Sequence, residues 1–198
     1  MFVTNFYQFP KEYRLWPDNP ASSYEAEPTL GGHSLSLGMI FTVISKITLK
    51  GVYINIMNGV SDSIDVSIGS SYVNENFFYN YNIEESETFS TLGMNQGWNR
   101  FNFSTPIELN SSSNKYYVIW YRQLQNNDYY YYGYAGSYFN NIPIQQGNLI
   151  IPTLDEMDSF HESWPNSPGV FRANPSDETD PPLSFWNNTN YWIDPIFW

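Results

Sequence analysis

The best evidence for the fold is the closing stretch Asn187-Asn-Thr-Asn-Tyr-Trp-Ile-Asp-Pro-Ile-Phe-Trp198. Its two leading asparagines suit a turn, because Asn tolerates positive φ and its side chain can bond the local backbone. From Tyr191 onward aromatic and β-branched residues dominate, which is typical of a pleated, half-buried strand. Free chain ends fray unless they are tied into a sheet, so we expect residues 191–198 to close one. Pro195 cannot donate to a ladder, which places this strand at a sheet edge or at a bend.

Earlier strands follow from alternation of apolar and polar residues. Residues 33–43 place Leu35, Leu37, Met39, Phe41 and Val43 on one face, as a strand with a period of two residues requires. The apolar phase then changes from Ile47 and Leu49 to Val52, Ile54 and Ile56, and a β-bulge at Gly51 explains the change. Asn58-Gly59 is a strong signal for a hairpin turn before the next alternating segment, which begins at Ser63.

The middle of the chain predicts further strands. Residues 77–79 and 88–92 suit short strands, with Glu84, Glu85 and Glu87 between them in a solvated loop. Residues 98–103 alternate again, and Pro106 marks the end of that strand. Residues 115–122 are apolar on both faces, which predicts a central strand covered on two sides. Residues 129–134 predict a tyrosine-rich strand antiparallel to it.

Two segments are irregular and rich in proline. Residues 1–30 form an extended arm, which either folds back over its own sheet or docks on a partner or neighbouring subunit. The candidate docking residues are its aromatic side chains: Phe2, Phe6, Tyr7, Phe9, Tyr13 and Trp16. In the closing strand, Trp192 and Trp198 lie opposite Tyr191, Ile193 and Phe197, and we expect them to meet the arm or a neighbouring subunit.

Residues 140–186 form the second irregular segment, a long proline-rich loop with a short strand at residues 169–172. Many short strands and no helix of useful length predict an all-β fold. We expect an antiparallel, jelly-roll-like β-sandwich over residues 31–198, preceded by the arm.

Composition limits the function. The chain has 198 residues, 20 Asp and Glu against 8 Lys and Arg, and a formal net charge of −12, so its surface repels nucleic acid and anionic lipid. It contains no cysteine, which excludes disulfides and thiolate metal sites. The first ten residues lack the basic and apolar regions of a secretory signal, and no apolar run could span a bilayer. We therefore expect a soluble chain that is not exported by the general route.

Catalytic and metal sites are not predicted. His33 and His161 lack the neighbours of a hydrolytic triad or a zinc motif. The acidic clusters at residues 155–158 and 177–180 lack the spacing of a calcium loop and are interpreted as solvated loop charge. A pair of carboxylates across a cleft stays open as a third, enzymatic reading. No cofactor and no metal site is expected.

The candidate ligand-binding residues are tyrosines that alternate along one predicted strand: Tyr129, Tyr130, Tyr131, Tyr132 and Tyr134. Some of them face outward whichever way the strand lies. Tyrosine offers an apolar face with a polar hydroxyl, which suits binding surfaces, and sugars stack on such rings. The alternative is that half of these rings belong to the core and the rest pack under the proline-rich loop.

Four stretches together resemble a known family. They are Ser36–Val43 with Ile47–Ile54, Gly97–Leu109, Lys115–Tyr121 and Asn187–Phe197. In their order and spacing they resemble the β-sandwich module known as domain of unknown function 4082, over about residues 33–198. Gly169–Arg172 also matches the short strand that this family places before its closing turn.

The resemblance implies a non-catalytic module, because the family has no assigned catalytic residues. Its members are usually appended to bacterial cell-surface or secreted proteins, often beside immunoglobulin-like or carbohydrate-active domains. This chain departs from that pattern in its short arm, in its lack of a signal peptide and in Pro195, where the family continues with an aliphatic residue.

These observations lead to two functional hypotheses. The first is a structural and attachment protein on the outer surface of a phage virion, a capsid decoration or fibre protein that docks through residues 1–30 on virion subunits or on itself. The second is a carbohydrate-binding accessory module of a bacterial cell-surface or extracellular protein, with glycan stacked on residues 129–134.

Overall fold

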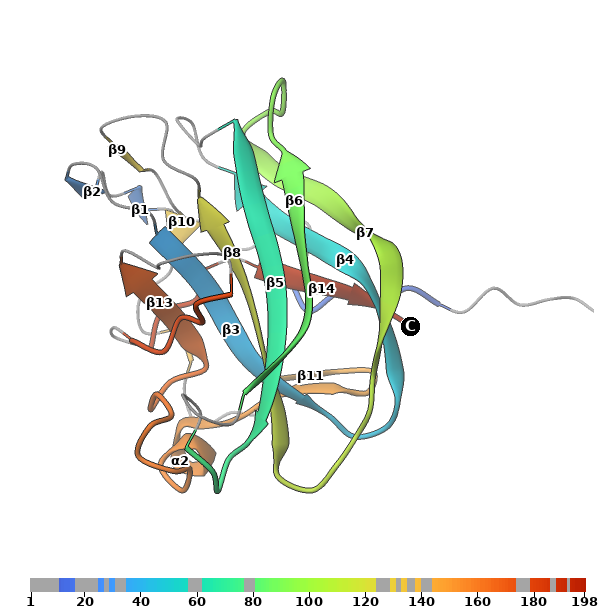
Figure 1. Cartoon of the computed structure of the whole chain (residues 1–198), viewed down its shortest axis with the longest axis vertical. Coiled ribbons are helices and arrows are strands. Elements are labelled where there is room, and N and C mark those ends of the chain that lie inside the picture. The colour runs from blue at the N-terminus through green and yellow to red at the C-terminus, as the bar shows by residue number, and fades with distance from the viewer. Residues whose placement is uncertain are drawn as a thin grey trace, which may run out of the picture.

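The computed structural model describes residues 11–16, 25–26, 29–30, 35–56, 62–76, 81–123, 129–130, 133–134, 138–139, 144–173, 179–185, 188–191 and 193–198. These residues form an antiparallel β-sandwich of two layers (Figure 1). A larger sheet forms one layer and a three-stranded sheet forms the other. The predicted all-β sandwich is confirmed.

The large sheet has seven strands. Their bounds are β3 Leu35–Val43, β5 Ser63–Tyr72, β6 Asn82–Ser90, β8 Lys115–Gln123, β11 Ile144–Gln146, β12 Leu149–Ile151 and β13 Gly169–Ala173. The order is β11-β12-β3-β8-β5-β6, with β13 paired to β3 as well. Strand β8 therefore lies between β3 and β5, as a central strand should.

The small sheet has the order β14-β4-β7. Its strands are β4 Ile47–Ile56, β7 Gly97–Leu109 and β14 Ile193–Phe197. Strand β14 lies at one edge, with Pro195 opposite Val52. The prediction of a closing strand at a sheet edge is confirmed.

The main core fills the space between the two sheets. Alternate residues of β3 and β8 face it, including Phe41, whose ring stacks on Tyr117 at 5.6 Å. The small sheet contributes residues of both phases of β4, because the register shifts between Leu49 and Gly51. The predicted bulge is therefore present. A Cβ at Gly51 would lie 2.0 Å from the carbonyl oxygen of Phe101, so only glycine fits this close approach.

The outer face of the large sheet is covered by the chain itself. Residues 152–168 and 179–185 pass across it and include the short helix α2 (Leu154–Met157), which Thr153 caps by accepting from the backbone N–H of Glu156. A second cluster joins Trp120 and Val118 of β8 to Met157, Trp164 and Val170. Strand β8 is thus buried on both faces, which explains its apolar sequence.

Three strand predictions are wrong. The strand predicted at residues 88–92 is present as far as Ser90, but it begins at Asn82 as strand β6. Glu84, Glu85 and Glu87 therefore lie in a strand and not in a solvated loop, because a sheet-edge strand can carry charge on its solvated side. Strand β7 continues through Pro106 to Leu109, because Pro106 falls where β7 and β4 lose register, and a bulge on an edge strand tolerates proline. The segments before and after Asn58-Gly59 do not pair as a hairpin, since β4 and β5 belong to different sheets. Residues 57–61 themselves lie outside the described residues, as do residues 77–79.

The predicted tyrosine-rich strand is also wrong in its partner. Residues 129–130 form β9, which pairs with β2 (Thr29–Leu30), and residues 133–134 form β10, which pairs with β1 (Glu25–Ala26). Both sides of β8 are already occupied by β3 and β5, so no place remains there. The short strand at residues 169–172 is confirmed as β13.

Candidate functional site

Residues 11–16, called the strap below, lie along the free edge of β14. The backbone N–H of Tyr13 donates to the carbonyl oxygen of Phe197 at 2.8 Å, and the two rings stack at 5.7 Å. Trp16 is buried, and its indole N–H donates to the carbonyl oxygen of Ile193 at 2.9 Å. Figure 1 shows the strap beside the C-terminus. For this part of the arm, the side chains fold back on their own sandwich.

Asp194 holds the strap in place from the middle of β14. Its carboxylate accepts from the backbone N–H of Leu15 at 2.7 Å, from that of Trp16 at 3.3 Å, and from Nε of Arg14 at 3.0 Å. The side chain of Asp194 is fully buried. Burial penalises the charged form and raises the pKa of Asp194 to about 6, although the N–H donors and Arg14 oppose the shift.

The raised pKa makes the stability of the fold depend on pH. Because the carboxyl of folded Asp194 binds a proton more tightly than an ordinary aspartate, its contribution to stability is greatest at low pH and is lost as pH rises through about 6. Between pH 7 and pH 5 the unfolding free energy should rise by about 1 kcal/mol from this group alone. Asp194→Asn removes this titrating group. The difference in unfolding free energy between wild type and Asp194→Asn, measured by urea unfolding, should therefore change by about 1 kcal/mol between pH 7 and pH 5. A constant difference would contradict the assignment.

Arg14 and Arg100 meet over one tyrosine ring on the outer face of the small sheet. The guanidinium carbon of Arg14 lies 3.8 Å from the ring centroid of Tyr53, and that of Arg100 lies 5.7 Å from it. Arg100 also donates to both carboxylate oxygens of Glu12, at 2.8 and 3.0 Å. In the sheet register Tyr53 of β4 is opposite Asp194 of β14 on one side and Arg100 of β7 on the other. Side-chain contacts therefore run from the strap across all three strands of the small sheet.

Two lysines, one on β4 and one in the strap, also lie over aromatic rings. Nζ of Lys50 lies 3.7 Å from the ring centroid of Trp198, and Nζ of Lys11 lies 5.2 Å from that of Tyr13. We name the surface the basic-aromatic face; it comprises Lys11, Tyr13, Arg14, Lys50, Tyr53, Trp98, Arg100 and Trp198. It gathers four of the eight Lys and Arg residues of a chain with a net charge of −12. Trp198 meets Lys50 here, and the strap contacts β14 at Ile193, Asp194 and Phe197. Trp192 lies outside the described residues.

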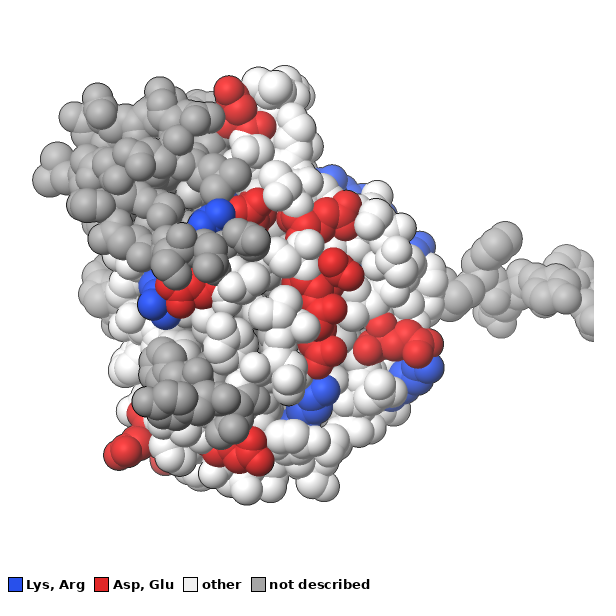
Figure 2. Space-filling view, in the orientation of Figure 1, with Lys and Arg blue, Asp and Glu red and all other residues white. Residues whose placement is uncertain are grey.

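Carboxylates gather on another side, where the open edges of the two sheets meet. We name this surface the acidic seam; it comprises Glu84, Glu85 and Glu87 of β6. Glu87 accepts from the backbone N–H of Ser104 of β7 at 2.8 Å, while Phe89 packs beneath on Phe101 at 5.5 Å. Figure 2 shows red side chains in a band over β6, down the middle of the visible face.

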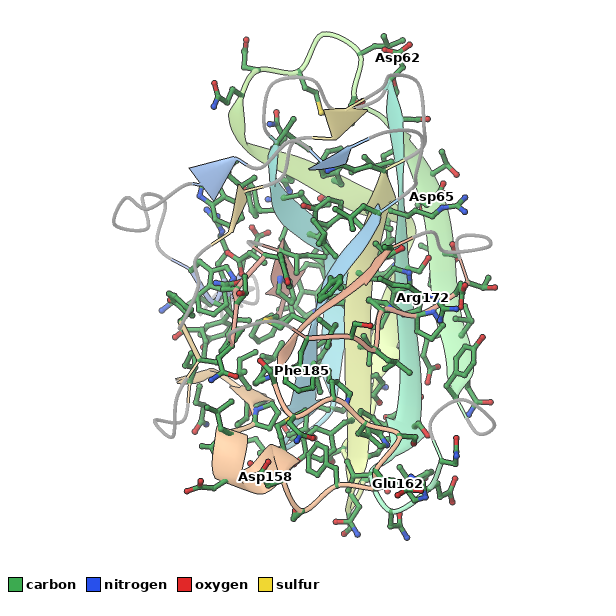
Figure 3. The ribbon with its side chains drawn as sticks, turned by 90° about the vertical axis from the view of Figure 1, so that its left-hand side faces the viewer. Asp62, Asp65, Asp158, Glu162, Arg172 and Phe185 are labelled. Carbon is green, nitrogen blue, oxygen red and sulfur yellow. The ribbon has the colours of Figure 1, made fainter. Side chains whose placement is uncertain are left out.

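A polar row crosses the outer face of the large sheet. Asp65 of β5 is 4% exposed and accepts from Nε and Nη2 of Arg122 at 3.0 and 2.8 Å, and from Thr88 at 2.6 Å. In register beyond Arg122 come Ser36 and then Arg172, which pairs with Asp180 at 2.7 Å. Figure 3 shows Asp65 and Arg172 on this side. Both arginines are thus neutralised by a carboxylate, which is typical of structural ion pairs.

The residues predicted as sites are only partly described. Of the predicted ligand-binding tyrosines, Tyr129, Tyr130 and Tyr134 are described through their backbone in β9 and β10, and Tyr131 and Tyr132 lie outside the described residues. Of the predicted docking aromatics, Phe2, Phe6, Tyr7 and Phe9 lie outside them, whereas Tyr13 and Trp16 contact their own domain.

The basic-aromatic face was not identified from the sequence. A usable signal existed, since Lys11 and Tyr13, and likewise Trp98 and Arg100, are two residues apart and therefore share a face when extended.

The remaining titratable groups form local contacts. Nδ1 of His161 accepts from the backbone N–H of Ser163 at 3.1 Å and closes a turn. Glu156 accepts from the hydroxyl of Tyr116, which ties α2 to β8; burial and this bond raise the pKa of Tyr116. Within the described ranges no three His, Asp or Glu side chains are grouped closely enough to hold a metal ion. None of the helices described is long and apolar enough to cross a membrane.

Comparison with known proteins shows which family the chain matches. The family model described as "Domain of unknown function (DUF4082)" matches residues 23–193. No curated protein matches the chain.

Proposed function

The chain belongs to the DUF4082 family, and we propose that it is a non-catalytic attachment protein that works through the basic-aromatic face. The observation that carries this proposal is the segregation of charge. A chain with 20 carboxylates and 8 basic residues places four of the basic residues, each over an aromatic ring, on the small sheet and the strap beside it. Asp194 and Glu12 pair with Arg14 and Arg100, so Lys11 and Lys50 carry the remaining positive charge. Electrostatic complementarity and half-exposed aromatic rings are typical of protein contact surfaces.

Ion pairs fix the two arginines of this face in position. Arg14 and Arg100 are held by Asp194 and Glu12, so their positions are fixed before any partner arrives. A surface that is ordered in advance loses less side-chain freedom on binding. The strap thus has a structural part in the proposal, because it supplies Lys11, Glu12 and Arg14. Display on the outer surface of a phage virion, as a decoration or fibre protein, remains our hypothesis for where this attachment operates.

The attachment proposal is tested by co-sedimentation with virions and cell envelopes from the organism that encodes the chain. We expect wild type in the pellet and Lys11→Glu/Lys50→Glu in the supernatant, at least about tenfold less bound, because the face loses its positive potential. Lys46→Glu makes the same change at an exposed site paired with Glu108, outside the face, and should bind as wild type does. Equal sedimentation of all three proteins would overturn the proposal.

A carbohydrate-binding module is a second candidate, and the half-exposed rings of Tyr53 and Trp198 on one sheet face favour it. Sugar rings pack on such side chains while the polar edge bonds their hydroxyls. The test is affinity electrophoresis through gels that each contain one neutral polysaccharide. If this candidate is right, at least one polysaccharide slows the migration of wild type, and Tyr53→Ala migrates without that delay. Migration unaffected by every polysaccharide would remove it.

A further inference from the structure

We propose that the partner of the basic-aromatic face is a second copy of this chain, which presents its acidic seam. This inference rests on the proposed function and names the partner of that same face. The contact joins two different surfaces of the chain, so each copy offers one basic and one acidic side. Such heterologous contacts repeat from copy to copy and give rings or filaments.

Charge complementarity is the first argument. Lys11 and Lys50 contact aromatic rings, and among the described residues no carboxylate lies in an ion pair with either. Across the molecule, Glu85 of the seam has only the backbone N–H of its neighbour Ser86 as a described partner, at 3.2 Å. Each surface therefore carries charge that the fold itself does not neutralise, and the two signs are opposite.

The position of the seam is the second argument. Strand β6 is the last strand of the large sheet, and its only strand partner among the described residues is β5. Edge strands of this kind offer backbone groups to another chain unless charge or cover prevents it. Glu84 is paired with Lys115 at 3.2 Å, but Glu85 and Glu87 repel an identical edge. Strand β6 is therefore protected from pairing with itself and is directed toward a basic surface.

The choice among anionic partners is the third argument. A nucleic acid, an acidic polysaccharide and a second copy would each fit a basic face locally, and each would approach a protein of net charge −12 against the same long-range repulsion. The overall charge therefore does not choose among them. Among anionic partners, the second copy is the one whose matching surface the structure itself contains.

The test is a charge-swap experiment read by sedimentation velocity. At about 20 mM salt, where screening is weak, wild type should show a mass that rises with protein concentration, and about 0.5 M salt should return it to the monomer. The face variant Lys11→Glu/Lys50→Glu and the seam variant Glu85→Lys/Glu87→Lys should each be monomeric alone. A mixture of the two variants should associate again. The acidic face of the face variant can then bind the basic seam of the seam variant, and the unchanged basic face of the seam variant can bind the unchanged acidic seam of the face variant.

Controls separate this outcome from misfolding and from the broader proposal. Lys46→Glu and Glu162→Lys make the same charge changes at exposed sites elsewhere and should associate as wild type does. Glu85→Lys alone spares the bond from Ser104, and it should still weaken association if the double variant proves unstable. A wild type that stays monomeric at low salt, or a mixture that fails to associate, would overturn self-association. Co-sedimentation with virions or envelopes that still depends on Lys11 and Lys50 would then leave the proposed function standing with another partner.

Discussion

Trp120→Ala should reduce the unfolding free energy by about 3–5 kcal/mol, the usual cost of truncating a large buried aromatic residue. Trp120 is fully buried on the outer face of β8, between the large sheet and the segment that covers it. Two glycines make room for it. A Cβ at Gly38 would lie 2.7 Å from Cβ of Trp120, and a Cβ at Gly69 would lie 3.4 Å from its ring.

The measurement is urea unfolding followed by circular dichroism at constant pH. Tyr72→Ala truncates another aromatic residue of the same sheet, but Tyr72 is 39% exposed, so its cost should stay below about 1 kcal/mol. A loss for Trp120→Ala as small as that for Tyr72→Ala would show that residues 152–168 and 179–185 do not cover the sheet as described.

Arg122→Leu should cost a similar amount, about 3–5 kcal/mol, because it leaves the buried carboxylate of Asp65 without its cation. The two side chains are 13% and 5% exposed, so water cannot replace the lost partner. Thr88 still donates to Asp65, but one hydroxyl does not neutralise a charge. Unfolding in urea at pH 7 measures the loss.

The double variant Asp65→Leu/Arg122→Leu is the matched comparison. It removes both charges and replaces them with apolar groups, so it should be more stable than Arg122→Leu alone. The exposed pair Lys46 and Glu108 provides a reference, since its two side chains are 54% and 62% exposed and such pairs contribute only about 0–1 kcal/mol. A double variant that loses the sum of both single losses would contradict the account of a buried ion pair.

Much of the fold could be predicted because alternation reports which side chains face the core. The apolar phases of β3 and β4, the bulge at Gly51 and the two apolar faces of β8 all follow from that pattern. Alternation does not report which strands pair. Strands β4 and β5 are neighbours in sequence but lie in different sheets. The short strands β9 and β10 pair with β2 and β1, about a hundred residues earlier in the chain.

The candidate surfaces were harder to predict for the same reason. The basic-aromatic face is assembled by strand pairing between segments that are far apart in the chain. These segments are the strap, β14, β4 and β7. The seam was missed because consecutive glutamates suggest a solvated loop, whereas an edge strand with one open side also accommodates them. The composition did contain one hint, since so few basic residues in so acidic a chain make their positions informative.

Zero-length carbodiimide cross-linking can show whether the basic-aromatic face of one copy meets the acidic seam of another. Equal amounts of ¹⁴N- and ¹⁵N-labelled protein are mixed at low salt, cross-linked and analysed by mass spectrometry. The ion pairs Lys46–Glu108 and Lys115–Glu84, at 2.6 and 3.2 Å, serve as internal controls and should give cross-links within one isotope. We predict mixed-isotope cross-links that join Lys50 or Lys11 to Glu85 or Glu87; internal cross-links alone would contradict the claim.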